Sequence, residues 1–85
     1  MAQPPSNFTF DQSTATLSWD PSPDGDFYEV EYSSDEGENW KNIYQGGYTS
    51  CPFPLPIGTY LVRGKARVGG GSFGPYSPPK KINVA

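Results

Sequence analysis

The chain has no histidine and only one cysteine, Cys51, among its 85 residues. Without histidine it lacks the side chain that most often serves as a general base, a metal ligand or a switch near neutral pH. A lone cysteine can form no internal disulfide, so we expect Cys51 to be a small buried apolar residue. No serine, threonine or cysteine has a histidine to activate it. We therefore predict a non-enzyme that carries no cofactor and no metal.

Long apolar runs and helix-forming segments are also missing. Ten glycines and ten prolines argue against helices and favour short strands joined by turns. No run approaches membrane-spanning length, and the start of the chain lacks the pattern of a secretory signal. We expect one soluble domain over residues 1–85, made without its own export signal and with no membrane partner.

Charge is scarce and unevenly placed. The net charge is −3, and eight of the nine acidic residues lie between Asp20 and Glu38, whereas all six basic residues lie from Lys41 onward. A nucleic-acid surface would need a net basic face, so we expect no nucleic-acid partner. The split instead favours cross-strand pairing of Glu29 and Glu31 with Arg63, Lys65 and Arg67 of the sixth predicted strand.

Alternating apolar and polar residues predict seven strands, over residues 7–11, 14–19, 27–32, 40–44, 48–54, 60–68 and 80–84. In the second strand Ala15, Leu17 and Trp19 should face inward. The fifth strand must lie at a sheet edge, because prolines remove its hydrogen-bond donors. The predicted structural core comprises Trp19, Tyr28, Val30, Tyr32, Tyr60 and Val62. Further rings remain after the core is assigned, and some of them must be exposed: Phe27, Tyr44, Tyr48, Phe53, Phe73 and Tyr76.

Several motifs together resemble a fibronectin type III domain over nearly the whole chain. They are Trp19 on the second strand, Tyr28-Glu29-Val30-Glu31-Tyr32 on the third, Pro56-Ile57-Gly58-Thr59-Tyr60 before the sixth and Gly74-Pro75-Tyr76-Ser77-Pro78 before the last. The resemblance implies an all-β fold, a seven-stranded antiparallel β-sandwich of immunoglobulin-like topology. Strands one, two and five would form one sheet, and strands three, four, six and seven the other. Tyr60 would form a tyrosine corner.

Two departures from the family pattern stand out. The spacing from Leu55 to Tyr60 is one residue shorter than usual, and Gly64 stands where a branched apolar residue is common. We expect a ring, from Trp19 or Trp40, to fill the space beside Gly64.

The family topology gathers a candidate interaction surface at one pole of the sandwich. It consists of Asp24, Asp26, Phe27, Phe73 and Tyr76. Exposed rings beside flexible polar residues are typical of protein recognition surfaces. The alternative is that Phe73 and Tyr76 close the end of the core.

Two short motifs suggest chemistry but favour structural roles. Residues 20–31 match a calcium-loop pattern, yet prolines restrict the loop and no helix flanks it, so we interpret it as a turn whose aspartates bond their own backbone. Residues 33–40 match S-x-D-x-G-x-x-W, which resembles the Asp-box hairpin of sialidase-type repeats. There we expect Asp35 and Gly37 to fix a tight turn that Trp40 covers.

These observations favour a non-catalytic structural or protein-interaction module. Because the chain starts at a Met and stops with its last strand, we expect a bacteriophage virion component, such as a tail, fibre or capsid decoration or adhesion protein. The alternatives are a spacer or accessory module of a secreted bacterial carbohydrate-active enzyme, or a part of a cell-surface adhesion receptor, which would be extracellular. The expected partners are other protein subunits, and a cell-surface glycan is a further possibility.

Overall fold

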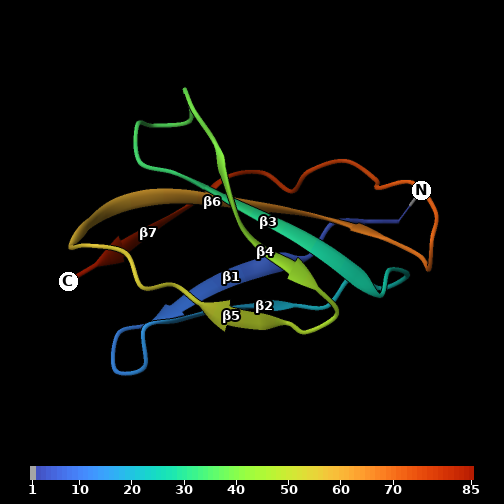
Figure 1. Cartoon of the computed structure of the whole chain (residues 1–85), viewed down its shortest axis with the longest axis horizontal. Coiled ribbons are helices and arrows are strands. Elements are labelled where there is room, and N and C mark those ends of the chain that lie inside the picture. The colour runs from blue at the N-terminus through green and yellow to red at the C-terminus, as the bar shows by residue number, and fades with distance from the viewer. Residues whose placement is uncertain (1) are drawn as a thin grey trace.

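The computed structural model describes residues 2–85, and within them it contains strands and no helix (Figure 1). The strands are β1 (Ser6–Asp11), β2 (Thr16–Asp20), β3 (Phe27–Ser33), β4 (Lys41–Gly46), β5 (Ser50–Pro52), β6 (Gly58–Arg67) and β7 (Lys80–Val84). No helix in this part of the chain could cross a bilayer.

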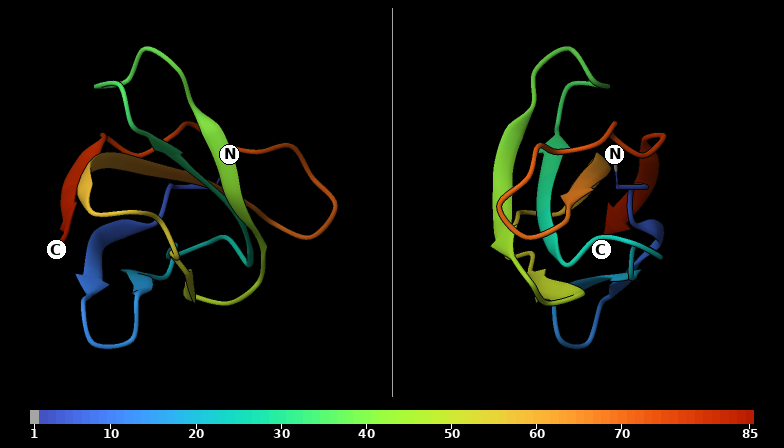
Figure 2. Two further views of the ribbon diagram at one scale, coloured as in Figure 1. Left: turned by 60° about the vertical axis from the view of Figure 1, so that its left-hand side comes forward. Right: turned by 90° about the vertical axis from the view of Figure 1, so that its right-hand side faces the viewer.

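Two antiparallel sheets face each other (Figure 2). One has the order β1-β2-β5 and the other the order β4-β3-β6-β7. This confirms the predicted all-β sandwich, the division of the strands between its sheets and the edge position of β5.

Apolar side chains that alternate along the strands fill the space between the sheets. Five of the six residues predicted for the core are buried: Trp19, Tyr28, Val30, Tyr60 and Val62. The sixth, Tyr32, is only half-buried and packs its ring edge-on against Phe53 and Tyr60. Cys51 is buried, as expected, and burial raises the pKa of its thiol to about 11.

The tyrosine corner is present where β6 begins. The Tyr60 hydroxyl donates a hydrogen bond of 2.7 Å to the backbone carbonyl oxygen of Pro56. This bond ties the bend before β6 to the core, although the spacing from Leu55 is one residue short.

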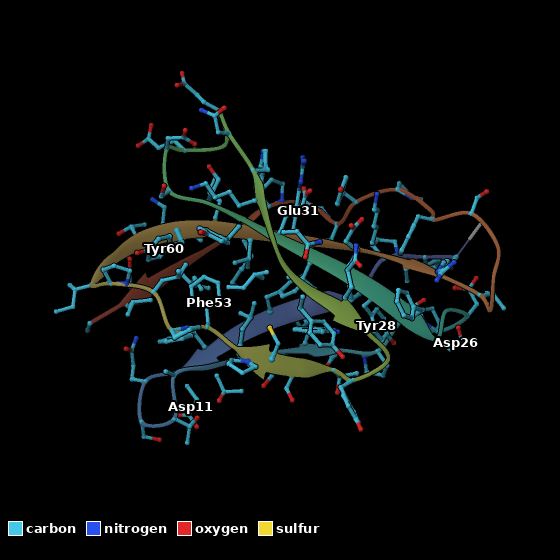
Figure 3. All side chains as sticks on the ribbon, in the orientation of Figure 1. Asp11, Asp26, Tyr28, Glu31, Phe53 and Tyr60 are labelled. Atoms are coloured by element: carbon cyan, nitrogen blue, oxygen red, sulfur yellow. The ribbon has the colours of Figure 1, made fainter. Side chains whose placement is uncertain are left out.

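Of the rings expected among the surplus, Phe53 belongs to the core and Tyr44 is half-buried against it. Phe53 is completely buried and packs against Tyr60 at 5.6 Å (Figure 3), although it follows a strand of only three residues. Its amide donates to the carbonyl of Ala15, which draws this segment across the sheet. Tyr44 packs against Trp19 at 5.7 Å. Of the surplus rings, Tyr48 is strongly exposed, at 78%.

The space beside Gly64 is filled, but not by the expected tryptophans. A Cβ atom at Gly64 would lie 2.9 Å from Pro5 Cγ and 3.0 Å from Phe8 Cζ. The prediction of Trp19 or Trp40 was wrong because the lead-in to β1 crosses the core at this point, which a local sequence pattern does not show.

Several predicted strand ends were also wrong. The fifth strand, predicted over residues 48–54, covers only Ser50–Pro52. Ala15 has a φ of 51° and lies in the turn before β2, so it is not an inward strand residue. Val68 is 57% exposed because β6 has already ended at Arg67. Trp40 precedes β4 and belongs to the β3–β4 hairpin.

Candidate functional site

The outward face of β6 carries three cations interleaved with aromatic rings. Arg63, Lys65 and Arg67 alternate with the inward-facing Gly64 and Ala66, so all three side chains leave the same face about 7 Å apart. In order along the strand, the stack reads Trp40, Arg63, Tyr76, Lys65, Phe73, Arg67 and Phe27. We call these seven residues the cation–aromatic ladder.

The ladder is continuous by distance. The Arg63 guanidinium lies 4.0 Å from the ring centres of both Trp40 and Tyr76. Lys65 Nζ lies 4.7 Å from the Tyr76 ring centre and 4.8 Å from that of Phe73. Each such contact contributes about 0.5–1 kcal/mol at an exposed site and about 2 kcal/mol when desolvated.

The far end of the ladder is built from Arg67 and two phenylalanines. The Arg67 guanidinium lies 5.3 Å from the Phe73 ring centre and 4.4 Å from that of Phe27, and the two rings are 6.3 Å apart. These contacts complete a stack that runs along the outward face of β6.

The β6–β7 connection supplies two of the rings because it runs back along β6 (Figure 1). The amide of Gly74 donates to the Ala66 carbonyl at 2.9 Å, and the amide of Ser77 donates to the Gly64 carbonyl at 2.7 Å. The Gly64 amide in turn donates to Ser77 Oγ at 3.0 Å. This backbone register fixes the segment on which the Phe73 and Tyr76 rings stand between the cations.

Two glutamates of β3 anchor the cations from the neighbouring strand. Arg63 Nη2 lies 2.9 Å from Glu31 Oε1, and Lys65 Nζ lies 3.0 Å from Glu29 Oε2. The four side chains are 17–26% exposed, and pairs near the surface contribute about 0–1 kcal/mol each, so these pairs set register more than stability. The predicted pairing of the glutamates is therefore confirmed for Arg63 and Lys65, but it was wrong for Arg67, which lies opposite Phe27.

The ionisation of the central pair follows from these contacts. Burial alone would raise the pKa of Glu29, but hydrogen bonds from Lys65, Gln45 and Asn42 outweigh it and hold the pKa below its usual value. Burial would lower the pKa of Lys65, but its hydrogen bonds with Glu29 and Tyr76 raise it overall. Both groups therefore stay charged near neutral pH, and the ladder keeps its cations.

The five residues predicted for the interaction surface divide into two groups. Phe27, Phe73 and Tyr76 come together in the ladder, half-buried on the outward sheet face and outside the core cluster. Asp26 accepts a hydrogen bond from the Gly69 amide. Asp24 accepts one from the Gln3 amide, which lowers the pKa of Asp24. The interaction role of all five stays a prediction.

Four members of the ladder are absent from the interaction surface that the sequence predicted: Trp40, Arg63, Lys65 and Arg67. The signal was present in two parts, because the cations recur every second residue and Phe73 and Tyr76 stand three apart. Nothing local in the sequence showed that the β6–β7 connection lies across β6 and interleaves the two sets.

The β3–β4 hairpin has the structural role expected of its Asp-box pattern. Asp35 accepts hydrogen bonds from Ser33 Oγ at 2.6 Å and from the Asn39 amide at 2.9 Å, and the Ser33 bond is the largest cause lowering the Asp35 pKa to about 2. The indole N–H of Trp40 donates to the Gly37 carbonyl at 3.0 Å, so the ring closes over the turn.

The calcium-like segment is organised by a serine rather than by its aspartates. Ser22 Oγ accepts from the amides of Asp24, at 3.4 Å, and Gly25, at 2.9 Å. Asp20 instead accepts from the Asn7 side chain at 2.7 Å. Within residues 2–85, no group of three or more His, Cys, Asp or Glu side chains is placed to hold a metal ion.

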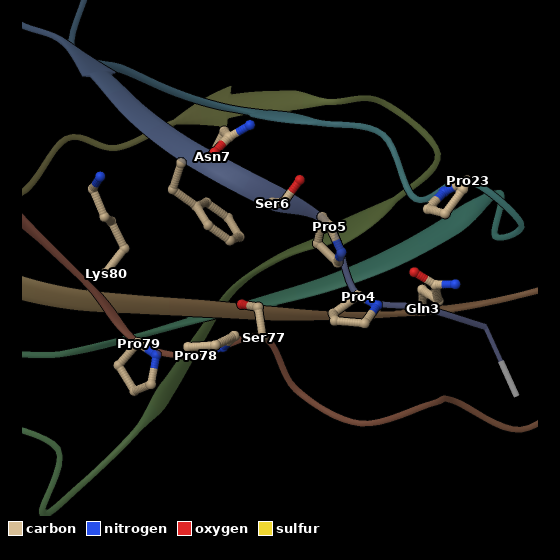
Figure 4. Close-up of a pocket in the computed structure, with 11 residues that line it drawn as sticks. Gln3, Pro4, Pro5, Ser6, Asn7, Pro23, Ser77, Pro78, Pro79 and Lys80 are labelled. Carbon is tan, nitrogen blue, oxygen red and sulfur yellow. The ribbon is translucent and has the colours of Figure 1, made fainter.

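A groove of about 560 Å³ lies on the other side of the molecule, between the lead-in to β1 and the approach to β7 (Figure 4). Its lining includes Pro4, Pro5, Pro23, Pro78 and Pro79. Proline offers no N–H donor, and the Ser77 hydroxyl in the groove already accepts from the Gly64 amide. The groove is lined by prolines mixed with polar side chains such as Asn7 and Lys80, and it holds no activated nucleophile.

Comparisons with known proteins were made against family models, curated proteins and solved structures. No family model matches the chain, and no curated protein matches it. An Fn3-like protein from Clostridium thermocellum superposes with a TM-score of 0.77 at 21% identity, over 99% of this chain and 94% of that one. The fn3 domain of human collagen alpha-1(XX) chain superposes with a TM-score of 0.60 at 21% identity, over 99% of this chain and 84% of that one.

The strand order and the tyrosine corner define an immunoglobulin-like β-sandwich. More narrowly, the chain has the fibronectin type III fold, as its motifs predicted.

Proposed function

We propose that this domain is a non-catalytic structural and protein-interaction module, and that the cation–aromatic ladder is its interaction surface. The observation that carries this proposal is the ladder itself, seven interleaved and half-buried side chains on the outward face of a sheet. Arginine and aromatic side chains are the residues that protein interfaces concentrate. Here they are held rigid by stacking, so little side-chain entropy is lost on binding.

A protein partner suits the ladder better than a glycan. Sugars stack on the open face of a ring, but Tyr76 has Arg63 and Lys65 over it and Phe73 has Lys65 and Arg67 over it. Because these cations are spaced two residues apart along β6, one lies on each side of the ring between them. A protein partner can instead offer polar and aromatic side chains to the half-buried cations and rings.

For the biological setting we propose a bacteriophage virion, in which the domain serves as a tail, fibre or capsid decoration. A rigid sandwich with one adhesive face suits a symmetric array, where each copy docks on neighbouring subunits. The second candidate is a spacer or accessory module of a secreted bacterial carbohydrate-active enzyme; its one point of support is that a bacterial Fn3-like protein, from Clostridium thermocellum, shares the fold.

Hydroxyl-radical footprinting of the domain, alone and within particles from its host, tests this proposal. We expect Trp40, Phe73 and Tyr76 to be protected from oxidation in the particle, whereas Tyr48, exposed on another part of the molecule, keeps its reactivity. Recovery of the chain only in the culture supernatant, joined to an enzyme, would support the second candidate. Equal oxidation of the ladder in both states would refute the interaction surface.

A further inference from the structure

The three cations of the ladder differ in what lies opposite them on β3. The register pairs Arg63 with Glu31 and Lys65 with Glu29, but it pairs Arg67 with Phe27. Two of the cations therefore have a carboxylate across the strand, and the third has a ring in the position where the alternation would place an acid. Within residues 2–85, the ion pairs to this face are those of Arg63 and Lys65.

Arg67 is also short of hydrogen-bond acceptors. Its Nε atom is buried without a partner among the described residues. The Phe27 and Phe73 rings stack on the guanidinium but accept nothing in its plane, where its five N–H groups point. Asp26, which directly precedes the register partner Phe27, already accepts a hydrogen bond from the Gly69 amide at 3.0 Å.

We propose that the Arg67 end of the ladder binds a carboxylate on a partner protein. This proposal rests on the proposed function and specifies the chemistry of the partner. The partner would supply to Arg67 the acidic side chain that Glu31 and Glu29 supply to the other two cations. A planar guanidinium packed against two neighbouring rings is pre-oriented for a two-pronged bond to a carboxylate, and half-burial strengthens that bond. Exposed lysines such as Lys81 are not held against aromatic rings in this way.

A matched pair of peptides tests the proposal on the intact domain. We would titrate acetyl-Phe-Asp-amide and acetyl-Phe-Asn-amide while following the arginine Nε–Hε resonances by NMR. We expect the Asp peptide to shift the Arg67 resonance saturably and to bind about fivefold more tightly than the Asn peptide, as one half-exposed charge pair allows. The Arg63 resonance should move little, because Glu31 already occupies its donors.

Two variants distinguish loss of the Arg67 charge site from a general loss of folding. Arg67→Gln should abolish the preference for Asp, and Phe27→Glu should do the same by supplying a carboxylate from the chain itself at the register position. Lys81→Gln removes an equal charge elsewhere and should leave the preference intact. Unchanged preference in Phe27→Glu would overturn the proposal even if Arg67→Gln failed to fold.

The remaining outcomes are also decisive. Equal binding of the two peptides would overturn the carboxylate site. Tighter binding of N-acetylneuraminic acid than of the Asp peptide would overturn the protein partner in favour of a sugar acid. If the ladder is protected from oxidation in particles but the domain does not prefer the Asp peptide, the carboxylate site is refuted while the proposed interaction surface stands. If the ladder is not protected in particles, the interaction surface itself is refuted.

Discussion

The two buried tyrosine hydroxyls should differ in their value to stability, because one accepts a hydrogen bond and the other donates one. Tyr28 accepts from the Ser22 amide at 3.0 Å in a buried position. Tyr28→Phe therefore leaves a buried N–H without a partner, which costs about 1–3 kcal/mol. Tyr60→Phe leaves the carbonyl oxygen of Pro56 without its hydrogen bond, but Pro56 is exposed and water can replace the hydroxyl. We therefore expect the free energy of unfolding to fall by only about 0.5–1.5 kcal/mol.

Urea unfolding of the variants, followed by tryptophan fluorescence, measures this order. Tyr48→Phe is the matched control, since Tyr48 is 78% exposed, and its free energy of unfolding should stay within about 0.5 kcal/mol of the parent. In an 85-residue domain each kcal/mol corresponds to roughly 4–8 °C in Tm. If Tyr28→Phe proved no more costly than Tyr60→Phe, with equal m values, the reasoning from the orphaned donor would be refuted.

Three further predictions follow from single sites. The pKa of Asp35 is lowered to about 2 from an ordinary 3.8, so its ionised form stabilises the fold above about pH 3.8, and this stability is lost as the pH falls toward 2. In Asp35→Asn the free energy of unfolding should therefore depend less on pH in that window. An unaltered pH dependence would contradict this reasoning. Gly64→Ala places a Cβ 2.9 Å from the Pro5 ring and should lower the free energy of unfolding by about 1–3 kcal/mol, whereas Gly70→Ala, with open space around it, should change it by less than about 0.5 kcal/mol. The Cys51 thiol, with its pKa raised to about 11, should react with a disulfide reagent at pH 8 only after unfolding, so rapid labelling of the native domain would count against its burial.

Local patterns in the sequence predicted most of the fold. Alternation with period two placed Val30 and Val62 in the core, and the turn before Tyr60 marked the tyrosine corner. These features depend on neighbours in sequence, which is why they were accessible. The position of Phe53 was not accessible, because prolines on both sides weaken the strand signal while a bond to the Ala15 carbonyl pulls the segment inward.

The candidate site was predictable only in pieces. The charge split predicted pairing of Glu29 and Glu31 with cations on β6, and the surplus of rings predicted exposed aromatics. The cations and the rings come together only because the β6–β7 connection lies against β6, a contact fixed by backbone hydrogen bonds of Gly74 and Ser77. Such a contact has no periodicity, so the ladder required the structure.

The arrangement of the ladder also shows where the charge split leaves one cation without an acidic partner among the described residues. A pairing device alone needs one acid for each cation, and two of the three cations on β6 meet that requirement. At the third position β3 carries Phe27, whose ring holds Arg67 in place but leaves its charge uncompensated within the described residues. A half-buried cation is costly unless something neutralises it, and a partner that brings its own carboxylate removes that cost on binding. The same row of residues can thus fix the register of the sheet over two positions and offer a complementary charge at the third.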